Sequence, residues 1–74
     1  MLEKIIEVVS EFSKVDKERI SEDTNIAELG VDSLTMIKII TELEHVFGVS
    51  FDDEEIVESR IVADLYENIL KKKS

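Results

Sequence analysis

The segment of the sequence with the clearest chemical potential is Leu29–Leu34, which reads LGVDSL in one-letter code. Gly30 and Asp32 are residue types found in turns and at helix caps, and an apolar periodic segment follows them. Ser33 is therefore expected at a loop–helix junction. The unpaired N–H groups of a helix start favour an anionic group, so a phosphodiester on the Ser33 hydroxyl would be well placed. Taken alone, these residues favour the simpler interpretation that Ser33 only caps the helix.

A serine hydrolase is one competing interpretation, because the Gly-x-Asp-Ser-Leu block loosely resembles the serine blocks of esterases. Nucleophilic catalysis would require a base beside Ser33. The only histidine, His45, lies twelve residues further along the same expected helix, roughly 18 Å away at about 1.5 Å per residue. A general base must lie within about 3 Å of its proton donor, or one water molecule further. The hydrolase interpretation is therefore rejected, and no catalytic residue is assigned.

A calcium-binding loop is a second alternative, since small acidic helical chains include the EF-hand proteins. Such a loop places oxygen ligands at positions 1, 3 and 5, glycine at position 6 and glutamate at position 12. A loop starting at Asp16 would have Ile20 and Ser21 at positions 5 and 6, and one starting at Asp52 would have Ile56 at position 5. Neither register fits, and no metal site is expected.

Composition and charge limit the classes of function. The 74 residues suffice for a single domain, residues 1–74, and they include no cysteine, so the core depends on the 43% of hydrophobic residues. Acidic residues number 18 against 9 lysines and arginines. Between Glu22 and Asp64 there are twelve acids and two bases, Lys38 and Arg60. Such a surface repels nucleic acid and anionic membranes and attracts basic protein surfaces, unless it serves solubility alone.

The sequence predicts a soluble protein of the cytoplasm. The N-terminal residues show no basic stretch followed by an apolar run, so they do not form a signal peptide. No apolar stretch approaches the ~20 residues of a membrane helix. The absence of cysteine suits a reducing compartment.

Hydrophobic spacing predicts an all-α fold, a small four-helix bundle with three longer helices, one short third helix and a long first loop. The first helix is expected over about Leu2–Lys14. The loop covers Val15–Asp32, and loops of this length are usually functional. One helical turn is expected at Asn25–Leu29, ended by Gly30 in a left-handed conformation. Three apolar residues are expected to pin the loop to the core: Ile20, Ile26 and Leu29.

The other helices are placed by cap residues and charge. The second helix is expected to follow a cap at Asp32 or Ser33 and to end at Gly48. It is apolar over so much of its surface that it is either central to the bundle or exposes contact residues. The short third helix is expected over about Asp53–Glu58, where acidic residues suit the positive end of the dipole. Ser59 is expected to cap the fourth helix, which ends in three lysines.

The serine segment and its surroundings resemble the acyl carrier proteins. The motif Leu-Gly-x-Asp-Ser-Leu is similar to the phosphopantetheine attachment motif of that family, and it lies at the head of the second helix. The order of the elements also matches over essentially the whole chain. The helix Leu34–Phe47 carries Leu43 and Glu44 near its end, and an acidic segment, Asp52–Glu55, opens the third helix.

The resemblance implies a carrier protein rather than an enzyme. A phosphopantetheinyl transferase would move a 4'-phosphopantetheine arm from coenzyme A onto the Ser33 hydroxyl. Asp32 would help to position the magnesium ion that the transferase holds. The terminal thiol of the arm would bind acyl intermediates as thioesters, for delivery to enzymes of fatty acid, polyketide or related biosynthesis. The helices could shelter an acyl chain between them, and the family suggests a monomer.

In this family the acidic face of the second helix docks on basic patches of acyl-loading and synthase enzymes. The contacts that the resemblance implies here are Leu34, Met36, Ile37, Thr41, Glu42 and Glu44. Packing in the core is an equal alternative for Leu34 and Ile37. The match is incomplete, because Lys38 stands where the family often has an acid and Thr35 where aspartate is common. His45 and Val46 also replace part of a glutamate run. These departures favour a dedicated set of partners, as in a polyketide or other specialised pathway.

Two further interpretations stay open at the level of the sequence. One is an aminoacyl or peptidyl carrier of a nonribosomal pathway, although the motif of such carriers is often less acidic around the serine. The other is an acidic helical interaction module without a prosthetic group, in which Ser33 is only a cap.

Overall fold

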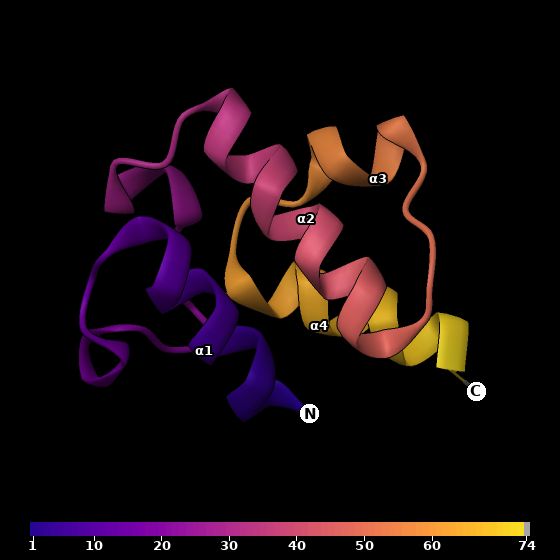
Figure 1. Cartoon of the computed structure of the whole chain (residues 1–74), viewed down its shortest axis with the longest axis horizontal. Coiled ribbons are helices and arrows are strands. Elements are labelled where there is room, and N and C mark those ends of the chain that lie inside the picture. The colour runs from indigo at the N-terminus through magenta and orange to yellow at the C-terminus, as the bar shows by residue number, and fades with distance from the viewer. Residues whose placement is uncertain (74) are drawn as a thin grey trace.

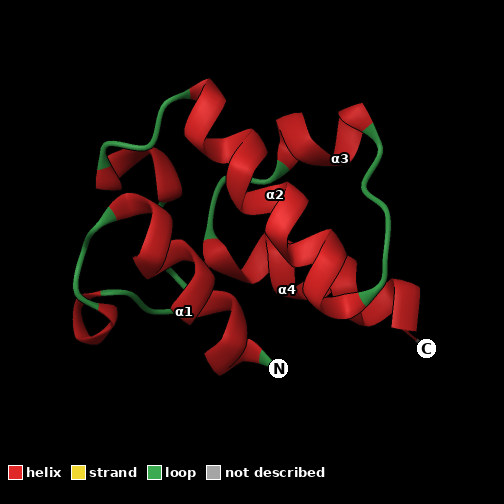
Figure 2. Cartoon of the chain, viewed as in Figure 1, coloured by secondary structure: helices red, strands yellow, loops and turns green. Residues whose placement is uncertain are grey.

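The computed structural model, which describes residues 1–73, consists of helices joined by loops (Figure 1) and has one cluster of buried apolar side chains. The helices are α1 (Leu2–Ser13), α2 (Ser33–Phe47), α3 (Asp53–Glu58) and α4 (Val62–Lys73). Two short 3₁₀ segments, η1 (Lys17–Arg19) and η2 (Ile26–Leu29), lie between α1 and α2. Figure 2 shows helices and loops only over the described residues. The expected all-α four-helix bundle with a short third helix is confirmed. Within the described range, no helix has the length and apolar character needed to cross a bilayer.

The core is built from the apolar faces of α1, α2 and α4. Each of the three helices contributes three buried side chains: Ile5, Val8, Val9, Ile39, Ile40, Leu43, Val62, Leu65 and Ile69. α1 packs against both α2 and α4. Complete burial of one such side chain stabilises a fold by about 1.5–3 kcal/mol. These three helices therefore supply most of the hydrophobic stabilisation, whereas α3 has no fully buried residue and supplies little.

The connection between α1 and α2 is held by backbone pairing with the segment before α4. The Ile26 N–H donates to the Arg60 carbonyl oxygen at 2.9 Å, and Asn25 and Ile61 form an isolated antiparallel bridge. The three anchoring residues expected from the sequence are buried or partly buried against the core: Ile20, Ile26 and Leu29. Both buried side chains and backbone hydrogen bonds therefore hold this loop against the rest of the fold.

Three helical segments end in a residue with left-handed backbone geometry. Gly30 (φ 79°) ends η2 and Gly48 (φ 66°) ends α2, as the sequence predicted. Lys14 (φ 64°) ends α1, although the sequence placed it inside the first helix. A residue with a Cβ atom is disfavoured in this conformation by about 1–2 kcal/mol, so glycine is the residue type expected there. A lysine gives no such sign, and the end of α1 at Lys14 could not be predicted from its residue type. Gly30 turns the chain just before the segment that carries Ser33.

The expected cap of the fourth helix at Ser59 is wrong. Ser59 ends α3 instead, because its N–H and its hydroxyl both donate to the Glu55 carbonyl oxygen, at 3.1 and 2.7 Å. The start of α4 is held by Asp64, whose carboxylate accepts from the N–H groups of Arg60 at 2.8 Å and Ile61 at 3.1 Å. A serine between two helices can close the first or open the second, and the spacing alone does not distinguish these two roles.

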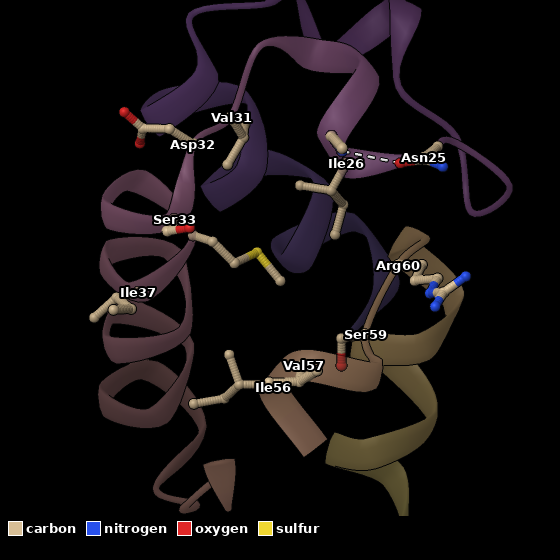
Figure 3. Close-up of a pocket in the computed structure, with 12 residues that line it drawn as sticks. Asn25, Ile26, Val31, Asp32, Ser33, Ile37, Ile56, Val57, Ser59 and Arg60 are labelled. Atoms are coloured by element: carbon tan, nitrogen blue, oxygen red, sulfur yellow. Dashed lines mark hydrogen bonds between the residues drawn. The ribbon is translucent and has the colours of Figure 1, made fainter. Parts of the chain in front are cut away.

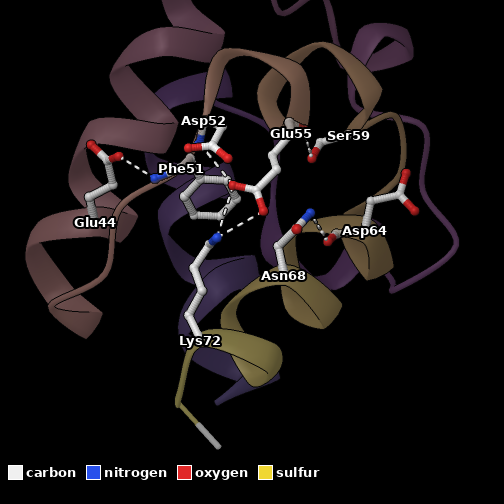
Figure 4. A network of polar contacts seen from close by, with 8 residues as sticks. All are labelled: Glu44, Phe51, Asp52, Glu55, Ser59, Asp64, Asn68 and Lys72. Carbon is white, nitrogen blue, oxygen red and sulfur yellow. Dashed lines mark hydrogen bonds and ion pairs between the residues drawn. The ribbon is translucent and has the colours of Figure 1, made fainter.

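α3 is attached to α4 by polar contacts (Figure 4). Both carboxylate oxygens of Glu55 accept from the Lys72 ammonium group, at 2.9 and 2.8 Å. The Lys72 ammonium also lies 5.6 Å from the centre of the Phe51 ring. Glu55 in addition accepts from the Asp52 N–H at 2.8 Å, which completes a capping box at the start of α3. These polar groups, together with the packing of Ile56 against the core, hold α3 in place.

Acid should weaken this attachment of α3. The hydrogen bond from Lys72, followed by that from the Asp52 N–H, holds the pKa of Glu55 below its ordinary value of 4.5. Because the unfolded chain binds this proton more readily, the stabilisation is complete above the ordinary value and is lost as the pH falls through the lower folded value. The urea midpoint, followed by circular dichroism, should fall over this interval, and Lys72→Met should remove part of the fall.

Lys4→Met is the matched control for this measurement. The Lys4–Glu7 pair is 3.6 Å apart, and its side chains are 48% and 58% exposed. Exposed pairs of this kind contribute only about 0–1 kcal/mol, so Lys4→Met should leave the acid dependence nearly unchanged. An acid dependence of Lys72→Met equal to that of the wild type would show that the Glu55–Lys72 contact does not stabilise the fold.

Candidate functional site

Ser33 is the first residue of α2 and is exposed to solvent. Figure 3 shows it at the head of the helix, next to Asp32 and Val31. The loop–helix junction that the sequence predicted for this serine is therefore confirmed. Of the two residues considered for the cap, the structure assigns the role to Asp32. Ser33 is therefore not the cap residue, and it is exposed at the edge of the chain segment that Asp32 caps.

Asp32 holds the first turn of α2 in place. Its carboxylate accepts from the Thr35 N–H at 2.8 Å, and its carbonyl oxygen accepts from the Met36 N–H at 2.9 Å. Hydrogen bonds from the backbone and then the side chain of Thr35 hold the pKa of Asp32 below its ordinary value of 3.8. Asp32 is therefore ionised at neutral pH, directly before the exposed hydroxyl of Ser33.

A largely apolar cleft of about 520 Å³ lies beside Ser33. Its apolar lining comes from η2, the following loop, α2 and α3: Ile26, Val31, Met36, Ile37, Ile56 and Val57. In Figure 3, Ile56 reaches from α3 toward α2 across this space. Small-molecule sites in proteins typically occupy about 300–1,000 Å³. The cleft is therefore large enough for a small apolar group or part of an alkyl chain.

Large apolar side chains stay in contact with water on α2 and α3. Leu34 is 62% exposed and Ile37 53% exposed on α2, and Val57 is 78% exposed on α3. Packing in the core, the alternative considered for Leu34 and Ile37, is therefore wrong. Ile37 and Val57 also line the cleft. Exposed apolar side chains that gather around a cleft are typical of surfaces that bind a partner or a ligand.

The other residues expected to contact partners lie in different surroundings. Met36 is half-buried and lines the cleft, and Thr41 is exposed. Glu42 and Glu44 are both half-buried. The Glu44 carboxylate accepts from the Phe51 N–H at 2.7 Å, so it holds the connection between α2 and α3 (Figure 4).

Several cleft residues were not found from the sequence. They come from three separate segments: Asn25, Ile56, Val57, Ser59 and Arg60. One signal was present, because a valine beside glutamates in a six-residue helix has little core to pack against. The loop residues gave no signal, since the pairing of Asn25 with Ile61 brings them together through long-range backbone contacts.

The structure also places the residues that were considered for a serine hydrolase and for a metal site. His45 is exposed and lies near the far end of the helix that begins with Ser33. Within the described part of the chain, no three His, Cys, Asp or Glu side chains converge on a possible metal position.

The comparisons with known proteins are consistent with this geometry. Residues 3–69 match the family model described as the phosphopantetheine attachment site. The chain is 41% identical to the acyl carrier protein of Rickettsia bellii, over 97% of this chain and 85% of that protein. It is 33% identical to the acyl carrier protein of Thermotoga maritima, over 93% of this chain and 86% of that protein. A crystal structure of the Thermotoga maritima protein superposes with a TM-score of 0.79 at 36% identity, covering 93% of this chain and 81% of that one.

The chain belongs to the acyl carrier protein family. Members of the acyl carrier protein family are carriers, and membership implies a covalently attached 4'-phosphopantetheine and interaction with partner enzymes. The residues found here fit this group. An exposed hydroxyl opens a helix, where anionic groups are favoured, and an apolar cleft lies beside it.

Two substitutions at Asp32 should separate its cap from its charge. Asp32→Asn keeps an oxygen for the Thr35 N–H, whereas Asp32→Ala removes it and should lower the urea midpoint of unfolding. Both substitutions remove the negative charge beside Ser33. If a phosphopantetheinyl transferase uses that charge, both variants should be modified about tenfold more slowly or worse.

The measurements are urea unfolding and the initial rate of modification by mass spectrometry. Modification of Asp32→Asn at the wild-type rate would leave Asp32 with a capping role alone.

Proposed function

We propose that Ser33 is the attachment site of the 4'-phosphopantetheine arm and that this chain carries acyl intermediates of fatty acid biosynthesis. One observation carries the proposal. In a member of the acyl carrier protein family, the serine of the LGVDSL segment is exposed at the first position of α2. The relatives reported above are named simply as acyl carrier proteins, which supports fatty acid biosynthesis over a specialised pathway.

The surroundings of Ser33 suit both ends of such an arm. When bound, the arm supplies a thiol that holds an acyl group as a thioester. The start of α2 favours the phosphate end, because the N–H groups of a first helical turn and the helix dipole attract negative charge. The apolar cleft, with Met36 and Ile56 in its walls, suits the acyl end by removing hydrocarbon from water.

Asp32 has a second role in this proposal. Its ionised carboxylate lies directly before Ser33, and its hydrogen bond to Thr35 fixes its direction. A phosphopantetheinyl transferase that brings magnesium and coenzyme A would find a carboxylate here to help position the metal. In this role Asp32 positions a metal that belongs to the transferase.

The docking surface for partner enzymes is proposed to surround the head and outer side of α2. Leu34, Met36, Ile37 and Thr41 would supply apolar and neutral contacts, with Glu42 and Glu44 at the edges. Acyl-loading and synthase enzymes with basic patches would be attracted by the negative charge of the segment from Glu22 to Asp64. Such attraction acts mainly on the rate of association and weakens with salt.

Incubation with coenzyme A and a broad-specificity phosphopantetheinyl transferase tests the proposal. The chain should gain the mass of one phosphopantetheine, because Ser33 is exposed. Ser33→Ala should abolish the gain. Ser50→Ala is the matched control, since Ser50 is also exposed but lies in the connection between α2 and α3. No gain in the wild type, or an undiminished gain in Ser33→Ala, would contradict the proposal, and the first result would instead support an interaction module without a prosthetic group.

A further inference from the structure

The outward side of α2 carries an unexpected set of side chains. A helix advances about 100° per residue, which places five exposed residues within one sector: Leu34, Ile37, Lys38, Thr41 and His45. We refer to these five residues as the outer face of α2. The buried residues Ile39, Ile40 and Leu43 lie on the opposite side of the helix. The outer face contains two apolar side chains, a lysine and a histidine, and it contains no carboxylate.

The carboxylates of α2 flank this face. By the same helical geometry, Glu42 lies to one side of it and Glu44 to the other, and both are half-buried. Glu44 already accepts from the Phe51 N–H at 2.7 Å, and Asp32, before the helix, accepts from the Thr35 N–H at 2.8 Å. A protein that approaches α2 from outside therefore meets Lys38 halfway along the face, on the side nearest Glu42, with Glu44 beyond the opposite edge.

Lys38 differs in charge from its surroundings. It and Arg60 are the only bases between Glu22 and Asp64, against twelve acids. The Lys38 charge is the smallest of the causes that hold the pKa of Asp32 below its ordinary value, after the hydrogen bonds from Thr35 and from the Asp32 backbone. A partner that binds this surface has to avoid placing a base opposite Lys38, because like charges brought together across an interface are strongly unfavourable.

The exposed apolar residues make this requirement strict. Leu34 is 62% exposed and Ile37 53% exposed, and they lie four residues before and one residue before Lys38. A partner that buries them must also remove water from around Lys38. An ammonium group that loses water without gaining a hydrogen-bonded counter-charge is destabilising. The partner therefore needs a carboxylate at that point, although the rest of its docking surface faces acids.

We propose that Lys38 is a specificity-determining residue of the docking surface. The enzymes that this chain serves present a carboxylate opposite Lys38, inside a docking surface that is otherwise basic and has apolar contacts for Leu34 and Ile37. Enzymes whose docking surface is basic throughout are disfavoured by repulsion from Lys38, which is selection against wrong partners. The inference rests on the proposed carrier function and adds the chemistry of the partner to it.

Loading by a defined enzyme tests the repulsion. The probe is an acyltransferase that loads a bacterial acyl carrier protein and whose docking surface contains arginine and lysine but no carboxylate. The full chain is first converted to its phosphopantetheine form, and acyl transfer from acyl-coenzyme A is followed by mass spectrometry. At about 50 mM salt, Lys38→Gln should load several-fold faster than the wild type and Lys38→Glu about tenfold faster. At about 500 mM salt these differences should largely disappear, because salt screens exposed charges.

Lys4→Glu is the control for net charge. It changes the total charge by the same amount as Lys38→Glu, but Lys4 lies on α1. Lys4→Glu should load at close to the wild-type rate. The proposal is overturned if Lys4→Glu accelerates loading as much as Lys38→Glu does, or if the wild type already loads as fast as Lys38→Glu at low salt.

A reciprocal change in the enzyme tests the predicted carboxylate. Each base of the enzyme's docking surface is replaced by glutamate in turn. One replacement should speed loading of the wild type and slow loading of Lys38→Glu, as a matched charge pair requires. If no replacement has this crossed effect, the carboxylate opposite Lys38 is disproved. Failure of the carrier function itself would look different, because no variant would then gain phosphopantetheine at all.

Discussion

The hydrogen bond from the Thr35 N–H to the Asp32 carboxylate, at 2.8 Å, determines where α2 begins. Gly30 prepares this start by turning the chain through a left-handed conformation, with φ of 79°. With the cap at Asp32, Ser33 becomes the first helical residue and is exposed to solvent. If Ser33 itself were the cap, its oxygen would be engaged with the N–H groups of the first turn. The accessibility of Ser33, the proposed attachment site, thus depends on a single capping contact.

The helices around this site contribute unequally to the hydrophobic core. α1, α2 and α4 share the buried side chains, and α2 is held in the middle of them while it presents Ser33 at its head. α3 forms part of the cleft wall, yet it has no fully buried residue. Its position depends on the packing of Ile56 against the core, on the Glu55–Lys72 pair and on the hydrogen bond from Phe51 to Glu44. Elements with few buried contacts open at low cost, so α3 is expected to open more readily than the three core helices.

Local patterns predicted most of this fold and much of this site. Apolar spacing located α1, α2 and α4, and a run of acidic residues located α3. Cap and turn residues located the ends of α2 and the turn at Gly30. The position of Ser33 was predicted because it depends on neighbouring residues alone.

Ser59 was assigned to the wrong helix, since a serine can cap either end of a helix. The cleft was not predicted, because its residues are joined by the long-range pairing of Asn25 with Ile61. The departure of Lys38 from the acidic pattern of the family was visible in the sequence, and the structure adds that Lys38 is exposed while Glu42 and Glu44 are half-buried.

Fragmentation mass spectrometry of the phosphopantetheine form of the whole chain tests the central claim most directly, because it assigns the group to one side chain. The account predicts that every modified fragment contains Ser33 and that fragments lacking this residue have their unmodified mass. A phosphopantetheine group on any other residue would contradict the account, because the start of α2 would then not be the attachment site.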